Sequence, residues 1–174
     1  MLAIACLGAG IAGIYGVIHD QITYTISEEY FTRLKFDQFR YADFGLHPRV
    51  FVAEIGFLAT WWVGFFSAWF LARIAVPAWS RELAIKRCLA GILLILVCAF
   101  VAAWIGNGIG LHRPAEDVAW QEFCDPLGVE DVPAFVRVAY IHLAGYVGAL
   151  IGLVGALGMI LAQRRRLGGM ENHG

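Results

Sequence analysis

The chain has 174 residues and a formal net charge of −1, with 60% hydrophobic and only 16% charged residues. Soluble proteins average about 45–50% apolar and about 25% charged residues, so this composition and a mean hydropathy of +0.68 indicate an integral membrane protein. The length fits a single membrane domain (1–174), and the near-neutral charge gives no support for a nucleic-acid partner.

Four apolar segments are predicted to form transmembrane helices, at about residues 2–18, 51–76, 88–111 and 138–162. Each is near the roughly 20 residues that a helix needs to cross the hydrocarbon core of a bilayer. The first segment has neither the basic flank nor the small-residue cleavage site of a signal peptide. We therefore expect a retained helix, and its short length is consistent with a start codon further upstream.

The connection after the first span is predicted to contain an interfacial helix that starts at Glu28. Ser27 is a suitable N-cap, Glu28 and Glu29 complement the helix dipole, and aromatic residues are then interleaved with basic ones. Residues 115–127 predict a second amphipathic segment, which is broken at Pro126. The expected fold is all-α: a four-transmembrane-helix bundle with two amphipathic interfacial segments on one face.

The distribution of charge predicts the orientation in the membrane. Basic residues are concentrated in the short connection 77–87 and in the tail at 164–166, whereas the connection 112–137 contains six acidic residues. The positive-inside rule therefore places both termini in the cytoplasm. The connection 19–50 weakens this contrast because it carries four basic residues of its own.

Small residues line one face of three predicted spans, as is typical of helices that approach closely in lipid. The stripes are Ala5, Ala9, Ala12 and Gly16; Ala99, Ala103, Gly106 and Gly110; and Gly145, Gly148, Gly152 and Gly155. The first stripe continues to His19, and the last is preceded on the same face by His142. We expect the three faces to meet at a common centre.

A polar layer is predicted at one membrane face. Because successive spans alternate in direction, the end of the first, the start of the second, the end of the third and the start of the fourth lie on one side. The polar residues there are His19, Asp20, Glu54, Asn107, His112, His142 and Tyr146. Ionisable groups inside spans are functional candidates, although a single histidine at the end of a membrane helix is more often an interfacial residue than a ligand.

Imidazole together with carboxylate is a typical ligand set for zinc, iron or copper. The main candidates for a transition-metal site are His19, His142, Asp20 and Glu54, and weaker ones are Glu28, Glu29 and His112. The spacing is not diagnostic, because there is no HExxH motif and His19 and Asp20 project from different sides of a helix. A haem pair and a proton or quinol site that uses Tyr146 remain alternatives.

Three segments carry a resemblance to other proteins: HDQITYTISEEYFT at 19–32, TWWVG at 60–64 and IHLAGYVGALIG at 141–152. They resemble a family of small, uncharacterised bacterial integral membrane proteins that have an HDQ(I/V)T…EYFT segment after the first transmembrane helix. The resemblance implies the four-span fold and a bacterial membrane location. It implies no mechanism.

Two functions of different class follow from these observations. The slightly favoured one is an accessory, assembly or structural subunit, which acts through helix packing and its extracytoplasmic caps on other membrane-protein subunits or on a second copy. The alternative is a small metal-dependent membrane enzyme or redox module with a His/carboxylate site at the outer membrane face. The sequence identifies no catalytic residue. It leaves the cofactor open, with a transition metal (zinc, iron or copper) as the main candidate.

Overall fold

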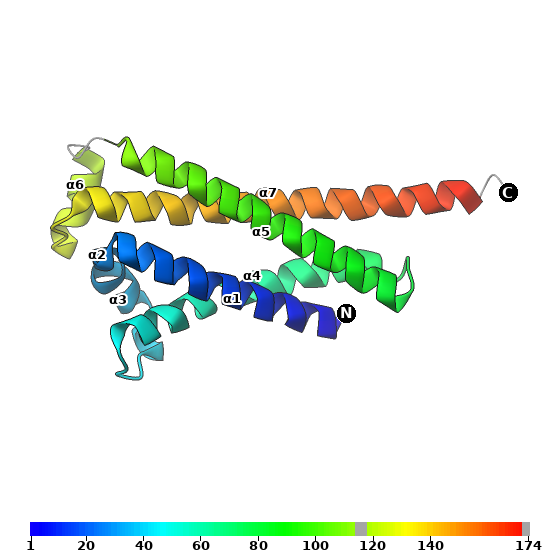
Figure 1. Cartoon of the computed structure of the whole chain (residues 1–174), viewed down its shortest axis with the longest axis horizontal. Coiled ribbons are helices and arrows are strands. Elements are labelled where there is room, and N and C mark those ends of the chain that lie inside the picture. Colours follow the sequence, from blue (N-terminus) through cyan, green and yellow to red (C-terminus); the bar gives the residue numbers. More distant parts are fainter. Residues whose placement is uncertain (114–117, 172–174) are drawn as a thin grey trace.

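The computed structural model describes residues 1–113 and 118–171, and all regular secondary structure in these ranges is helical. Four helices are long and apolar enough to span a membrane: α1 (Leu2–Ile26), α4 (Pro48–Ala75), α5 (Arg81–Leu111) and α7 (Val132–Glu171). They form an all-α transmembrane bundle (Figure 1), as predicted.

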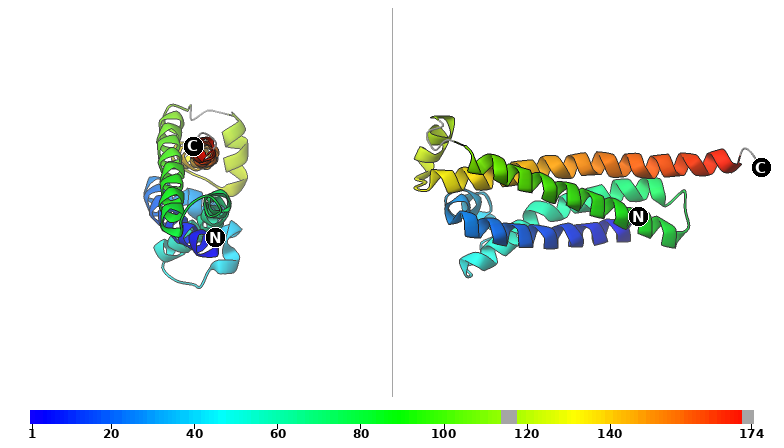
Figure 2. Two further views of the ribbon diagram at one scale, coloured as in Figure 1. Left: turned by 90° about the vertical axis from the view of Figure 1, so that its right-hand side faces the viewer. Right: turned by 45° about the horizontal axis from the view of Figure 1, so that its top comes forward.

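Short helical segments gather at one end of the bundle. After α1 the chain forms α2 (Glu28–Tyr30), a π-helical turn η1 (Phe31–Lys35), α3 (Phe36–Gln38) and the 3₁₀ turn η2 (Arg40–Ala42). Before α7 it forms α6 (Val118–Cys124) and η3 (Asp125–Leu127), while residues 115–117 of the predicted segment lie outside the described residues. Both connections lie at the same end, opposite the two termini (Figures 1 and 2).

The predicted spans are shorter than the helices. The first helix ends at Ile26 and not at residue 18, the second and third begin before residues 51 and 88, and the last begins before residue 138 and extends beyond 162. Hydropathy marks only the apolar part of a helix, whereas its ends are set by capping groups and chain breakers. Ser27 is such a group, as predicted, because its Oγ accepts a hydrogen bond from the Tyr30 N–H at 3.3 Å.

The glycine stripes pack the helices in two pairs, α1 with α4 and α5 with α7. Gly8 and Gly16 lie so close to α4 that a Cβ at either would collide with the backbone of Gly64 or Gly56, respectively. Gly148 lies in the same way against the Cys98 backbone of α5. Most of each stripe therefore packs within its own pair, because a glycine brings two neighbouring backbones together. Ala12, Ala99 and Gly145, one residue from each stripe, nevertheless line a common space between the pairs.

The first cap, which we define as the segment from α2 to η2 (residues 28–42), is packed onto the bundle and does not lie free in the headgroup region. Tyr30 and Phe31 are 7% and 0% exposed, and they pack with Tyr24, Phe135 and Val138 from the two helices beneath them. This cluster closes the capped end of the bundle. The prediction of an interfacial helix located the segment correctly, but it did not foresee that one side of the segment is buried against α1 and α7.

Candidate metal centre

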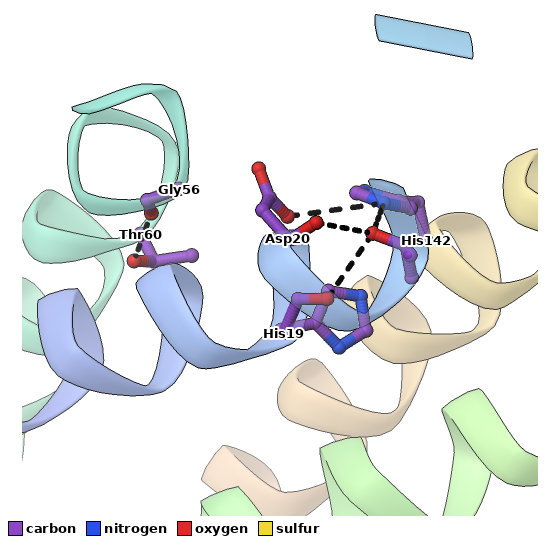
Figure 3. Close-up of polar contacts among 6 residues, drawn as sticks. His19, Asp20, Gly56, Thr60 and His142 are labelled. Atoms are coloured by element: carbon purple, nitrogen blue, oxygen red, sulfur yellow. Dashed lines mark hydrogen bonds and ion pairs between the residues drawn. The ribbon is translucent and has the colours of Figure 1, made fainter. Parts of the chain in front are cut away.

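His19 and Asp20 of α1 meet His142 of α7 under the first cap (Figure 3). One ligand atom from each residue lies within 4.8 Å of the other two, and Asp20 Oδ1 is 3.8 Å from His142 Nε2. The imidazole rings of His19 and His142 pack edge to face with centroids 4.9 Å apart. Asp20 and His142 are buried, and His19 is half-buried, so the cluster is largely shielded from solvent.

His19 and Asp20 are neighbours on α1, yet both reach His142. They can do so because α7 packs against the part of the α1 surface that lies between their two side chains. Successive side chains on a helix differ by about 100°, so a helix that packs between them contacts both. The sequence argument placed Asp20 off the packing stripe, and the structure shows that it is nevertheless buried beside that stripe.

Thr23 links the cluster to the backbone of α1. Its Oγ lies 3.2 Å from His142 Nε2 and 3.1 Å from the His19 carbonyl oxygen. A hydroxyl has one proton, so when it donates to the His19 carbonyl it accepts from an Nε2–H of His142. A metal ion bound at Nε2 would therefore displace that proton.

Aromatic rings and one buried lysine complete the surroundings. The Tyr30 ring packs on His142 at 5.0 Å, and the Tyr15 ring stacks on His19 at 5.6 Å. Lys35 ends the π-helical turn and is only 9% exposed. Burial lowers the pKa of Lys35, and the opposite charge of the Asp20 carboxylate counteracts part of that shift.

A narrow slot runs from the cluster into the bundle, between the two helix pairs. Its walls come from residues 8–20 of α1, 59–67 of α4, 92–99 of α5 and 142–149 of α7, and its volume is about 80 Å³. Thr60 fixes the wall between α1 and α4. Its hydroxyl lies 2.8 Å from the Ala12 carbonyl oxygen of α1. It also lies 2.7 Å from the Gly56 carbonyl oxygen of its own helix (Figure 3). Tyr146 also lines the slot, beside the histidines.

The other predicted ligands lie elsewhere. Glu54 lines a separate surface hollow with Phe44 and Phe57, and its Oε2 has no hydrogen-bond partner among the described residues. His112 is exposed, and its Nδ1 lies 2.7 Å from the Gly108 carbonyl oxygen. They fail to join the cluster because a shared membrane level does not fix the rotation of each helix about its axis.

The two remaining candidate ligands, Glu28 and Glu29, and Asn107 of the predicted layer have structural partners. Glu28 accepts a hydrogen bond from the Tyr24 hydroxyl at 2.9 Å. Glu29 accepts hydrogen bonds from the backbone N–H groups of Glu130, at 3.0 Å, and Asp131, at 2.7 Å, and these bonds lower the pKa of its carboxyl group. Asn107 accepts from Arg137 Nε at 2.7 Å, which ties α5 to α7.

Sequence reasoning missed Tyr15, Thr23, Tyr30 and Lys35. Tyr15, His19 and Thr23 follow one another at intervals of four residues, so they share a helix face. That signal was hidden because the first span was expected to end at residue 18. No comparable sequence pattern marks Lys35, which is buried because of the way the first cap folds onto the bundle.

Comparison with protein-family models, with curated proteins and with solved structures found no match to this chain. The function of the chain is therefore inferred from the site alone.

Proposed function

We propose that this chain is a small metal-dependent membrane protein, an enzyme or redox module, whose centre is formed by His19, Asp20 and His142. The observation that carries the proposal is the convergence of two imidazoles and a carboxylate from α1 and α7, within 4.8 Å of one another and shielded from solvent. Buried polar groups of this kind are costly in a membrane protein unless they have partners or a function.

The chemistry of the ligand set favours a transition metal with an open coordination position. Three protein ligands leave room for a water molecule or a substrate on zinc, and two histidines with one carboxylate are also the usual ligands of non-haem iron(II). Ligand atoms bind such ions at about 2.0–2.2 Å, so the side chains must draw together slightly from their present separations. The slot gives the open position a route for a reactant from within the membrane.

Metal analysis of the purified protein tests the proposal. We expect close to one zinc, iron or copper ion per chain after gentle purification, and its loss from His19→Ala and from His142→Ala. His112→Ala is the matched control, because this exposed histidine lies outside the cluster and should leave the metal content unchanged. A parent protein without stoichiometric metal would refute the proposal.

The accessory-subunit function remains the second candidate because the loop after the first cap exposes large apolar side chains. Tyr41, Phe44 and Leu46 are 79%, 76% and 56% exposed. Exposed apolar groups of this kind contact either lipid headgroups or another protein. Co-purification of a stable larger complex that Phe44→Ser disrupts would support the accessory function.

A bacterial cytoplasmic membrane, with both termini in the cytoplasm, is part of the same proposal. The basic residues at 77–87 and at 164–166 support the orientation. Cys124 is a poor reporter of sidedness because it is fully buried. A Tyr41→Cys variant should instead react with a membrane-impermeant maleimide on intact cells, with the unmodified chain as the control. Labelling that occurs only after cell disruption would show that the orientation is the opposite one.

A further inference from the structure

More than half of the basic residues of the chain lie at the end of the bundle opposite the caps, where α4 ends, α5 begins and α7 passes beside them (Figure 1). Residues 73–87 and 164–166 contain seven of the 13, and we call this group the basic corner: Arg73, Arg81, Lys86, Arg87, Arg164, Arg165 and Arg166. The same segments contain one acidic residue, Glu82, which pairs with Lys86 at 2.7 Å. The basic corner therefore carries a large excess of positive charge where the spans end.

Two buried N–H groups at the basic corner have no acceptor. They are Trp79 Nε1 and Arg87 Nε, and neither has a hydrogen-bond partner within residues 1–113 and 118–171. The two side chains are neighbours, because the guanidinium carbon of Arg87 lies 4.7 Å from the centre of the Trp79 ring. Buried donors without acceptors are destabilising, and a guanidinium forms its strongest hydrogen bonds with anionic oxygen atoms. The pair is therefore complementary to an anion that has several oxygen atoms.

Gln163 of α7 is the neutral partner that such an anion would replace. Its Oε1 contacts Arg87 Nη1 and so links α7 to the start of α5. An ionised acceptor binds a guanidinium more strongly than a neutral amide oxygen does. An anion can therefore compete with the Gln163 side chain for Arg87.

The surface beside the basic corner is apolar. Leu83 and Leu89 of α5 and Leu161 of α7 are 38%, 37% and 41% exposed. A soluble anion would leave this surface uncovered, whereas the acyl chains of a phospholipid would cover it. Basic groups at the ends of transmembrane helices are typical binding sites for the headgroups of anionic lipids. The neighbouring apolar surface thus favours a lipid phosphate over a free one.

We propose that the basic corner binds the headgroup of one anionic phospholipid, such as phosphatidylglycerol. The phosphate displaces the Gln163 side chain and accepts hydrogen bonds from Arg87 and from Trp79 Nε1, and the acyl chains lie against Leu89 and its exposed apolar neighbours. The surrounding arginines favour this lipid over phosphatidylcholine, whose headgroup has no net charge. The proposal does not depend on the metal centre, which lies at the capped end of the bundle.

Native mass spectrometry of the full chain tests the proposal. The chain is titrated in detergent with phosphatidylglycerol or with phosphatidylcholine that has the same acyl chains. We expect one phosphatidylglycerol molecule to bind about tenfold more tightly than phosphatidylcholine. Equal binding of the two lipids would overturn the proposal. Binding of glycerol 3-phosphate as tight as that of phosphatidylglycerol would also overturn it, because the site would then take a soluble phosphate.

Two substitutions that keep the net charge locate the headgroup. Trp79→Phe removes the indole N–H but keeps an aromatic ring, and Arg87→Lys removes Nε but keeps the positive charge. Each should weaken phosphatidylglycerol binding about 3- to 10-fold, the worth of one hydrogen bond. The matched controls are Trp104→Phe, at a side chain that is 70% exposed elsewhere on α5, and Arg81→Lys, at an exposed arginine of the basic corner. Both controls should bind as the parent does. Parent-level binding in all four variants would show that only the overall charge attracts the lipid, and would refute the site.

Substitutions of Gln163 test the placement of the phosphate from the side of α7. Gln163→Glu supplies a carboxylate that pairs with Arg87, so it should weaken phosphatidylglycerol binding about tenfold. Gln163→Ala removes the competing amide and should leave binding unchanged or make it tighter. Parent-level binding by Gln163→Glu, or weaker binding by Gln163→Ala, would refute the placement of the phosphate at Arg87.

Discussion

Replacement of Gly16 by alanine should separate α1 from α4 at their closest contact. A Cβ at Gly16 would lie well inside 3.0 Å of the Gly56 carbonyl oxygen and of Thr60 Oγ, closer than real Cβ atoms come to other atoms. Backbone cannot swing aside as a flexible side chain can. The two helices must therefore move apart, and the hydrogen bond from Thr60 to the Ala12 carbonyl is strained with them.

The expected magnitude follows from three contributions. Overpacking costs typically 1–3 kcal/mol, and a weakened interhelical hydrogen bond in a membrane costs about 0.6 kcal/mol. Alanine in place of glycine returns about 0.8–1.0 kcal/mol of helix propensity. The net loss in free energy of unfolding should be about 0.6–2.8 kcal/mol.

The matched control is Gly10→Ala on the same helix, because a Cβ at Gly10 meets no atom within 4 Å. It should leave stability unchanged or raise it slightly through helix propensity. Reversible unfolding in mixed detergent micelles measures both variants against the parent. Equal stability of Gly16→Ala and Gly10→Ala would refute the close packing of α1 on α4.

Three further predictions concern the cap and the cluster. Glu29→Gln should lower the thermal stability at pH 7 and remove part of the loss of stability that the parent shows in acid. Backbone hydrogen bonds to the ionised carboxylate lower the pKa of Glu29 below its usual 4.5. The stability that these bonds provide is therefore fully present above pH 4.5 and is lost as the pH falls through the lowered pKa. Thermal melts between pH 3 and 7 measure this, and identical pH profiles for variant and parent would contradict it. Thr23→Val should tighten zinc binding about 2- to 10-fold, because the Thr23–His142 hydrogen bond that stabilises the metal-free protein is lost, whereas weaker binding by titration would argue that Thr23 supports the bound ion. Lys35→Met should tighten zinc binding on the order of tenfold by removing a buried positive charge near the cluster, and unchanged affinity would place the metal away from Lys35.

The polar layer illustrates how far the sequence leads. The alternation of spans correctly brought His19 and His142 to one level, because a chain that crosses a membrane repeatedly must reverse direction each time. The same reasoning included Glu54 and His112, which the structure keeps apart from the cluster. The depth of a residue in the membrane follows from hydropathy, whereas the direction in which its side chain projects within the membrane plane does not.

The sequence predicted where the first cap begins, but it did not predict which of its side chains are buried against the bundle. Ser27 and the two glutamates after it predicted the new helix because capping is a local interaction. The burial of Tyr30 and Lys35 depends on helices that are distant in the sequence. Lys35 in particular looks like an ordinary basic residue of an interfacial helix.

By itself the sequence determined a membrane protein with four apolar helices and both long connections on one side, because hydrophobicity and chain reversal are properties of segments. Only the tertiary structure decided which glycines pair which helices, and therefore how each helix is rotated about its axis. That rotation places Asp20 and Thr23 against His142 and leaves the narrow slot between the pairs. It is set by contacts between side chains and backbones far apart in the chain, so no local pattern encodes it.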